Sequence, residues 1–285
     1  MKKLLLIFSL FATGIFVSCS SNKTEQASEE MMDTTMAEPQ DSASVAAREL
    51  LDFKFFYTIA NLPSPMEIIN AIYQHEVPFN KDLLNPADAE GKYNTAYKKA
   101  INYGVYGIDM AYAAFYGQNQ DLLEYYASTR KLSEKLGVQE TFDNFTTSFR
   151  ENSDDRDSLI KMIDRAYAET DAFLKTNKRL EVAAHVLAGT IIEVQYLSIE
   201  LMKGRERVKE NEEIFEKIYN QKLYVDNLVN LFTELKKIPS SAQLFIQLEE
   251  LKATYDNIKS PQDLDKANLE KLSAAVKKVR DDMIG

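Results

Sequence analysis

LEVAAHVLAGTIIEVQYLSIEL, residues 180–201, is apolar around most of the circumference that an α-helix would give it. Residues 97–115, YKKAINYGVYGIDMAYAAF, have the same character. Helices without a polar face belong at the centre of a domain, where amphipathic helices wrap them. Gly104, Gly107 and Gly189 each cost ~1 kcal/mol relative to alanine within a helix. Their presence in these two segments predicts a close crossing of the two central helices.

Amphipathic stripes fill the last third of the chain, where apolar residues recur at alternating steps of three and four. Pro239 and Ser260-Pro261 divide this region into three stretches, which should fold back on one another as antiparallel neighbours. The stripes are Ile214, Ile218, Gln221, Val225, Leu228, Phe232 and Leu235; Leu244, Leu248, Leu251, Tyr255 and Ile258; and Leu269, Leu272, Val276, Val279 and Met283. With only 9 glycines and 7 prolines in the chain, the pattern predicts an all-α multi-helix bundle of mostly antiparallel helices, one domain over residues 45–285.

Local signals mark the ends of two further helices. The run Ser64-Pro65-Met66-Glu67 offers an N-cap, a proline at the first helical position and a capping-box glutamate. Asn119 is expected to open another helix, which Gly137 should end.

The two central segments also resemble each other at an offset of 84 residues. Ile108-Asp109-x-x-Tyr112 falls on Ile192-Glu193-x-x-Tyr196, and Ala100 falls on Ala184. We interpret this as two pseudo-repeated halves built around the two buried helices, with chance similarity as the alternative because the identities are few.

The first residues have the plan of a secretory signal. Lys2 and Lys3 precede an apolar run over residues 4–17, which is shorter than the ~20 residues of a membrane span. Phe16-Val17-Ser18-Cys19 then resembles the lipobox of bacterial lipoproteins, with phenylalanine where leucine is usual. The alternative is an ordinary secretory peptide with an incidental cysteine.

The lipobox resemblance implies a signal peptide over residues 1–18 and a palmitate-type lipid on Cys19, the only cysteine of the chain. Because one acyl chain alone binds a membrane only marginally, the two or three chains of a lipoprotein would supply the anchor. Ser20 after the cysteine implies the outer membrane of a bacterial envelope rather than the inner membrane, with the periplasmic and surface faces both open.

Residues 19–44 are expected to form the lipidated end and a disordered acidic tether. Residues 20–44 hold six acidic side chains against Lys23 and show no helical or strand period. Thr34 and Ser42 lie in short patterns that resemble the O-glycosylation signal of exported Bacteroidetes proteins, and Ser158 lies in a third.

A broader resemblance rests on residues 102–112, NYGVYGIDMAY, and residues 187–196, LAGTIIEVQY, taken together with the lipobox. These segments resemble a family of all-helical Bacteroidetes lipoproteins to which no activity is assigned. The likeness runs from about Phe55 to the C-terminus. It implies the helical fold and the envelope location, and it transfers no catalytic residue.

Asp109 and Glu193 are the sharpest candidates for a binding site, because each interrupts an apolar stretch. A buried carboxylate must be paired, hydrogen-bonded or protonated. Tyr106, Tyr112 and Tyr196 lie three residues from these carboxylates, on the same helix faces. The group is therefore expected either to bind a cation, a polyol or an amine, or only to fix the register of the two central helices through tyrosine, lysine or arginine partners.

His185 is the remaining candidate on the second central helix. Carboxylate-bridged metal sites use Glu-x-x-His twice, whereas Glu181 and His185 stand four residues apart in a single copy. We therefore expect no metal at this position and interpret His185 as a core or edge histidine with a backbone partner.

Composition and motifs limit the function. The formal net charge is −10, and loss of Lys2 and Lys3 would leave −12, without the basic face that nucleic acid requires. No nucleophile elbow, phosphate loop or zinc motif is present, so no catalytic residue and no cofactor are assigned. The expectation is a non-enzymatic envelope lipoprotein that binds a protein partner or assists a membrane assembly. The alternative is a small-solute or glycan-binding lipoprotein with its site at the central helices.

Overall fold

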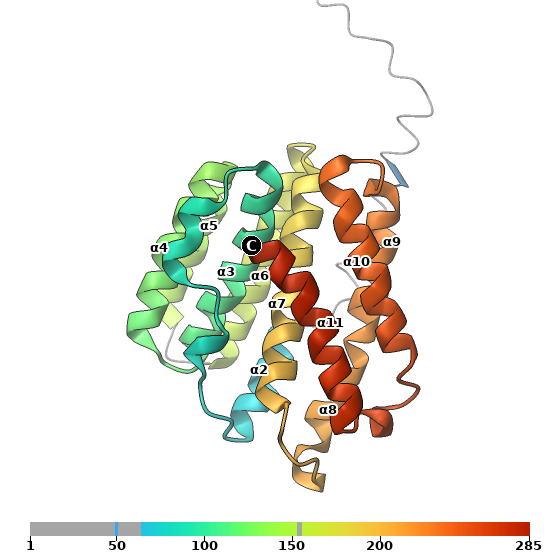
Figure 1. Ribbon diagram of the computed structural model, residues 1–285. Coiled ribbons are helices and arrows are strands. Elements are labelled where there is room, and N and C mark those ends of the chain that lie inside the picture. Colours follow the sequence, from blue (N-terminus) through green and yellow to red (C-terminus); the bar gives the residue numbers. More distant parts are fainter. Residues whose placement is uncertain (1–48, 51–63, 153–155) are drawn as a thin grey trace, which may run out of the picture. The chain divides into compact units, whose positions relative to one another are not determined.

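The computed structural model describes residues 49–50, 64–152 and 156–285, and within these ranges the chain is helical and contains no strand. The expected all-α multi-helix bundle is confirmed (Figure 1). The α-helices are α2 Met66–Gln74, α3 Ala96–Phe115, α4 Asn119–Leu136, α5 Gln139–Asn152, α6 Arg156–Thr176, α7 Leu180–Met202, α8 Glu212–Asn220, α9 Lys222–Leu235, α10 Pro239–Asp256 and α11 Lys266–Ile284. Cys19, Thr34 and Ser42, with the proposed signal peptide and tether, lie outside the described residues.

The two central helices, α3 and α7, form the most extensive contact in the bundle and run parallel to each other (Figure 1). Their contacts follow the same order along both helices. The rings of Tyr97 and His185 meet near the two N-termini, at 4.8 Å between centroids. Asp109 meets Glu193 two to three turns further along. Elsewhere in the bundle, helices that follow one another in the sequence pack as hairpins: α3 with α4, α5 with α6, and α9 with α10.

Two glycines explain how closely α3 and α7 approach. A Cβ at Gly104 would lie 2.2 Å from the carbonyl oxygen of Val186, and a Cβ at Gly189 would lie 2.1 Å from that of Ile101. No side chain fits at such distances, so the predicted close packing is confirmed at both positions. Gly107 lies instead on the side of α3 that lines a small pocket.

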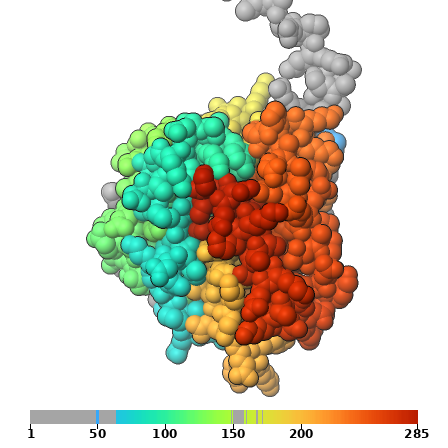
Figure 2. Space-filling view, viewed as in Figure 1, coloured from blue at the N-terminus to red at the C-terminus, as the bar shows by residue number. Residues whose placement is uncertain are grey.

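The C-terminal helices cover the other side of α7. The last helix, α11, packs on α7, α10 and α3. Figure 2 shows it, in red, lying along the seam between the teal and green helices and the orange ones. Its buried stripe is the predicted one, Leu269, Leu272, Val276, Val279 and Met283. The end of the chain is thereby brought against its middle.

Some helix boundaries differ from the sequence expectation. The stripe from Ile214 to Leu235 is divided between α8 and α9 at Gln221, which is buried and donates to the hydroxyl of Ser198 of α7 at 3.2 Å. Helix α2 begins at Met66, with the hydroxyl of Ser64 accepting a hydrogen bond from its N–H at 3.2 Å. Helix α4 begins at Asn119 and ends before Gly137, as predicted.

Helix α7 is also the one described helix with the length and hydropathy of a membrane span. The domain buries 89% of the 18-residue apolar window of this helix, as is usual for a core helix of a folded domain.

Candidate functional site

The buried carboxylates of the central helices meet an arginine from the last helix. Glu193 is fully buried and Arg280 is 4% exposed. The Nε and Nη2 atoms of Arg280 donate to the two carboxylate oxygens of Glu193, at 2.6 and 2.8 Å. Two parallel hydrogen bonds of this kind are the strongest geometry available to an arginine and a carboxylate. The guanidinium also lies 4.1 Å from the centre of the Tyr196 ring and donates to the carbonyl oxygen of Leu83 at 3.0 Å.

Asp109 lies beside this pair and is fully buried as well. Its Oδ2 accepts a hydrogen bond from the backbone N–H of Asn85 at 3.1 Å, while its Oδ1 has no donor among the described residues. Its carboxyl group also lies within hydrogen-bond reach of Glu193. Two carboxyl groups can share a hydrogen bond only when one of them carries a proton.

Burial raises the pKa of Asp109 well above its usual range, and the negative charge of Glu193 raises it further against the opposing effect of Arg280. Asp109 is therefore the protonated member of the pair. The cluster then holds one neutral acid, one carboxylate and one guanidinium, so its net charge is zero. A buried group of this kind avoids the large cost of an uncompensated interior charge.

A loop segment, residues 77–95, covers the cluster and extends its hydrogen bonds. The Asn85 amide donates to the hydroxyl of Tyr93 at 2.8 Å and to the Oδ1 of Asn102 at 3.3 Å. Asn102 in turn donates to the carbonyl oxygen of Met283 at 2.9 Å, near the end of α11. The network therefore joins α3, α7, α11 and the covering segment.

The tyrosines of the candidate site hold the covering segment and do not bond either carboxylate within the described part of the chain. The hydroxyl of Tyr106 donates to the carbonyl oxygen of Pro86 at 2.6 Å. The hydroxyl of Tyr112 accepts from the N–H of Asn80 at 3.0 Å. Tyr196 reaches the cluster through its ring face, on Arg280.

His185 lies apart from the carboxylates, nearer the N-terminus of α7 and about two turns before Glu193. It is buried, and its Nε2 lies 2.9 Å from the hydroxyl of Ser241 on α10, so its partner is a side chain and not the expected backbone group. Burial lowers the pKa of His185 to about 4. The imidazole is therefore neutral at physiological pH.

Sequence reasoning did not single out Arg280, the residue that completes the cluster. A signal was present, because Arg280 is the one arginine of the last helix and stands four residues after Val276 of the buried stripe. Lysine is the common basic residue there, and an isolated arginine on an apolar face indicates a paired guanidinium.

Ser158, the third glycosylation candidate, lies in the first turn of α6 and is partly buried. Across residues 49–50, 64–152 and 156–285, no three His, Cys, Asp or Glu side chains gather as metal ligands would.

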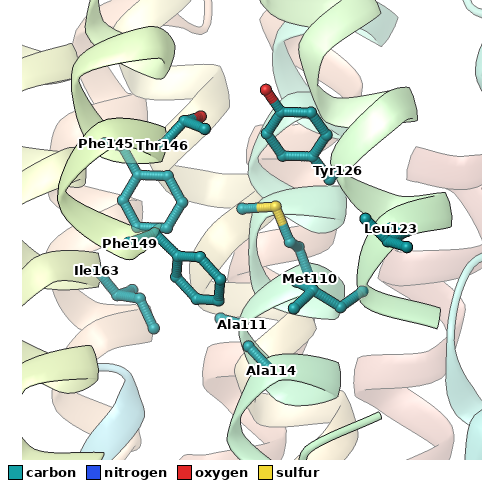
Figure 3. Close-up of a pocket in the computed structure, with 10 residues that line it drawn as sticks. Met110, Ala111, Ala114, Leu123, Tyr126, Phe145, Thr146, Phe149 and Ile163 are labelled. Atoms are coloured by element: carbon teal, nitrogen blue, oxygen red, sulfur yellow. The ribbon is translucent and has the colours of Figure 1, made fainter. Parts of the chain in front are cut away.

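A pocket of about 170 Å³ lies on the side of α3 that faces α4 and the hairpin formed by α5 and α6 (Figure 3). Met110 of α3 faces two phenylalanine rings of α5 across it, and its lining is almost wholly apolar. It is lined by Met110, Leu123, Tyr126, Phe145, Phe149 and Ile163, among others. Sequence reasoning gave no indication of this pocket.

No protein-family model, no curated protein and no solved structure matches this chain.

Proposed function

We propose that the chain is a lipid-anchored protein of the bacterial envelope whose helical domain is a non-enzymatic binding or assembly module. The observation that supports this most is the bidentate pair between Glu193 and Arg280. A catalytic or ligand-binding carboxylate needs a free lone pair and an approach for the substrate. Here the guanidinium and the covering segment occupy the position that an external amine or cation would take.

The alternative, a small-solute or glycan-binding lipoprotein centred on Asp109 and Glu193, is the weaker proposal. A solute that reached these carboxylates would have to displace Arg280, which makes three hydrogen bonds to the protein within the described residues. Leaving a buried guanidinium unpaired costs several kcal/mol, on the order of 3–5. A thermal-shift screen with polyols, amines and sugars tests this alternative, because a ligand at 100 times its Kd adds ~2.7 kcal/mol to stability.

The proposed anchor is tested by Cys19→Ala. Without the thiol no acyl chain can be attached, and the remaining polar tether binds a bilayer too weakly to hold the domain. We expect the variant to move from the membrane fraction to the soluble fraction of fractionated cells, with Ser20→Ala as the control that stays in the membrane. Retention of Cys19→Ala in the membrane fraction would contradict the lipid anchor.

The proposed partner is tested by photo-cross-linking in intact cells. A photoreactive phenylalanine analogue at Leu223 or Ile246 would place the probe on exposed apolar positions, 61% and 50% exposed, of the helices α9 and α10. A reproducible adduct of one mass supports a binding or assembly role, provided that the exposed control position Lys271 on α11 does not give it. Recovery of uncross-linked protein alone from every exposed position would contradict the role.

A further inference from the structure

We propose that the pocket between α3, α4 and the α5–α6 hairpin binds the apolar end of a neutral amphiphile, a molecule with an alkyl or aryl group and an uncharged hydrogen-bonding head. This site is separate from the buried carboxylate cluster. It depends neither on the lipid anchor nor on a protein partner.

The size of the pocket fits such a group. Its volume is about 170 Å³. An apolar protein cavity of about 150 Å³ stays dry and takes up benzene, so this one holds a ring or a chain of roughly six carbons. A second pocket of about 40 Å³ shares Met110, Phe145 and Ile163 with the first. Because methionine side chains adapt easily, movement of Met110 would let a longer chain extend toward it.

The lining selects an uncharged ligand. The walls are carbon atoms of Met110, Phe145, Phe149 and Ile163, and none of the described residues that line the pocket is acidic or basic. An ion placed there would lose its hydration without gaining a partner, which costs far more than burial of an alkyl group gains. A neutral group instead gains the free energy of burying apolar surface.

The mouth offers a place for a polar head. Tyr126 lies there half-buried, and within the described residues its hydroxyl makes no hydrogen bond. Figure 3 shows this hydroxyl at the far end of the Tyr126 ring, above Met110 and clear of the rings of Phe145 and Phe149. Leu123 beside it is 63% exposed. A ligand whose tail fills the pocket would cover Leu123 and bring a hydroxyl or carbonyl head to Tyr126.

The test uses the absence of tryptophan from the chain. Leu123→Trp, introduced into the full chain with Cys19→Ala so that no attached lipid competes, gives a single tryptophan at the mouth, which is excited at wavelengths that the tyrosines do not absorb. The probe is 6-bromohexan-1-ol, whose bromine quenches a nearby indole. We expect saturable quenching, and competition by unbranched alcohols whose affinity rises about fourfold per methylene and levels off once the pocket is filled. Hexanoate should compete at least tenfold more weakly than hexan-1-ol.

Three variants make the result specific. Ala114→Leu fills the pocket and should abolish saturable quenching, whereas Ala253→Leu, at an exposed site on α10, should not. Tyr126→Phe should lower the affinity for hexan-1-ol severalfold and leave the affinity for benzene unchanged. If Ala114→Leu fails to fold, the proposal is still tested by the dependence of affinity on alcohol chain length and by the loss of affinity for hexan-1-ol in Tyr126→Phe. Quenching that rises linearly with probe, or that is the same in Ala114→Leu and Ala253→Leu, would overturn the proposal.

Discussion

Asp109 and Glu193 stand at matching positions of two central helices, yet their surroundings give them different protonation states. Glu193 receives two hydrogen bonds from Arg280, while Asp109 receives one from a backbone N–H and none at Oδ1 within the described residues. Since one cation serves two carboxyl groups, the proton stays on the one that the cation does not bond. Asparagine is therefore the closest neutral replacement for Asp109, and it keeps both an acceptor and a donor.

We predict that Asp109→Asn does not destabilise the protein at pH 7. The pKa of Asp109 is raised in the folded state, so below the unfolded pKa of about 3.8 both states carry the proton. Above that pH the unfolded state releases its proton first, and the stability of the wild type falls as pH rises. Asp109→Asn has no proton to release at this position. Its free energy of unfolding relative to the wild type should therefore rise by about 1.4 kcal/mol per pH unit, from pH 4 until the pKa of Asp109 in the folded state is reached.

Urea unfolding of the wild type and Asp109→Asn from pH 3.5 to 8 measures this difference. Exposed ion pairs titrate equally in both proteins and cancel. A loss of stability in Asp109→Asn that increases with pH would show that Asp109 is ionised in the folded state.

His185 should produce a dependence of opposite sign. Burial lowers its folded pKa to about 4, from 6.5 in the unfolded chain, so between these values the unfolded state binds the extra proton. The contribution of the neutral His185 to the free energy of unfolding is fully present above pH 6.5 and is lost as the pH falls toward 4. As the pH falls through this window, the free energy of unfolding of the wild type relative to that of His185→Gln should therefore decrease by about 1.4 kcal/mol per pH unit. A constant difference would contradict the buried neutral imidazole.

At the scale of the helix, the crossing of α3 and α7 depends on two missing side chains. We predict that Gly104→Ala and Gly189→Ala each lower the free energy of unfolding by about 3 kcal/mol, the upper end of the usual cost of overpacking, since a clash with backbone atoms cannot be relieved by a side-chain rotation. Gly91→Ala is the matched control, because a Cβ there would meet nothing within 4 Å. Thermal melting followed by circular dichroism measures all three. Equal small effects would contradict the tight crossing.

The helices were predictable from sequence because their signal is local. An apolar stripe such as that from Leu269 to Met283 reports burial of one face whatever covers it. The pairing of Glu193 with Arg280 joins residues 87 positions apart, and no local pattern specifies it. The contact of Gln221, at the break between α8 and α9, with Ser198 on another helix is of the same non-local kind. The pocket beside Met110 depends on how the α5–α6 hairpin docks, which periodicity does not report.

At the scale of the whole domain, the buried cluster links parts of the chain that are far apart in sequence. The covering segment, the two central helices and α11 all contribute a group to it. We infer that it specifies how α11 closes on the bundle, and that this is the role of the residues that sequence alone could also assign to ligand binding. A buried ion pair serves such a role when removal of one partner leaves the other charge uncompensated.

A double-mutant cycle at Glu193 and Arg280, measured by urea unfolding at pH 7, tests this most directly. Glu193→Met and Arg280→Met should each cost about 3–5 kcal/mol. The double variant should cost several kcal/mol less than their sum, because two apolar side chains replace the pair together. Single losses below about 1 kcal/mol that add without coupling would mean that the pair does not hold the fold together, and that these charges are kept for an external ligand.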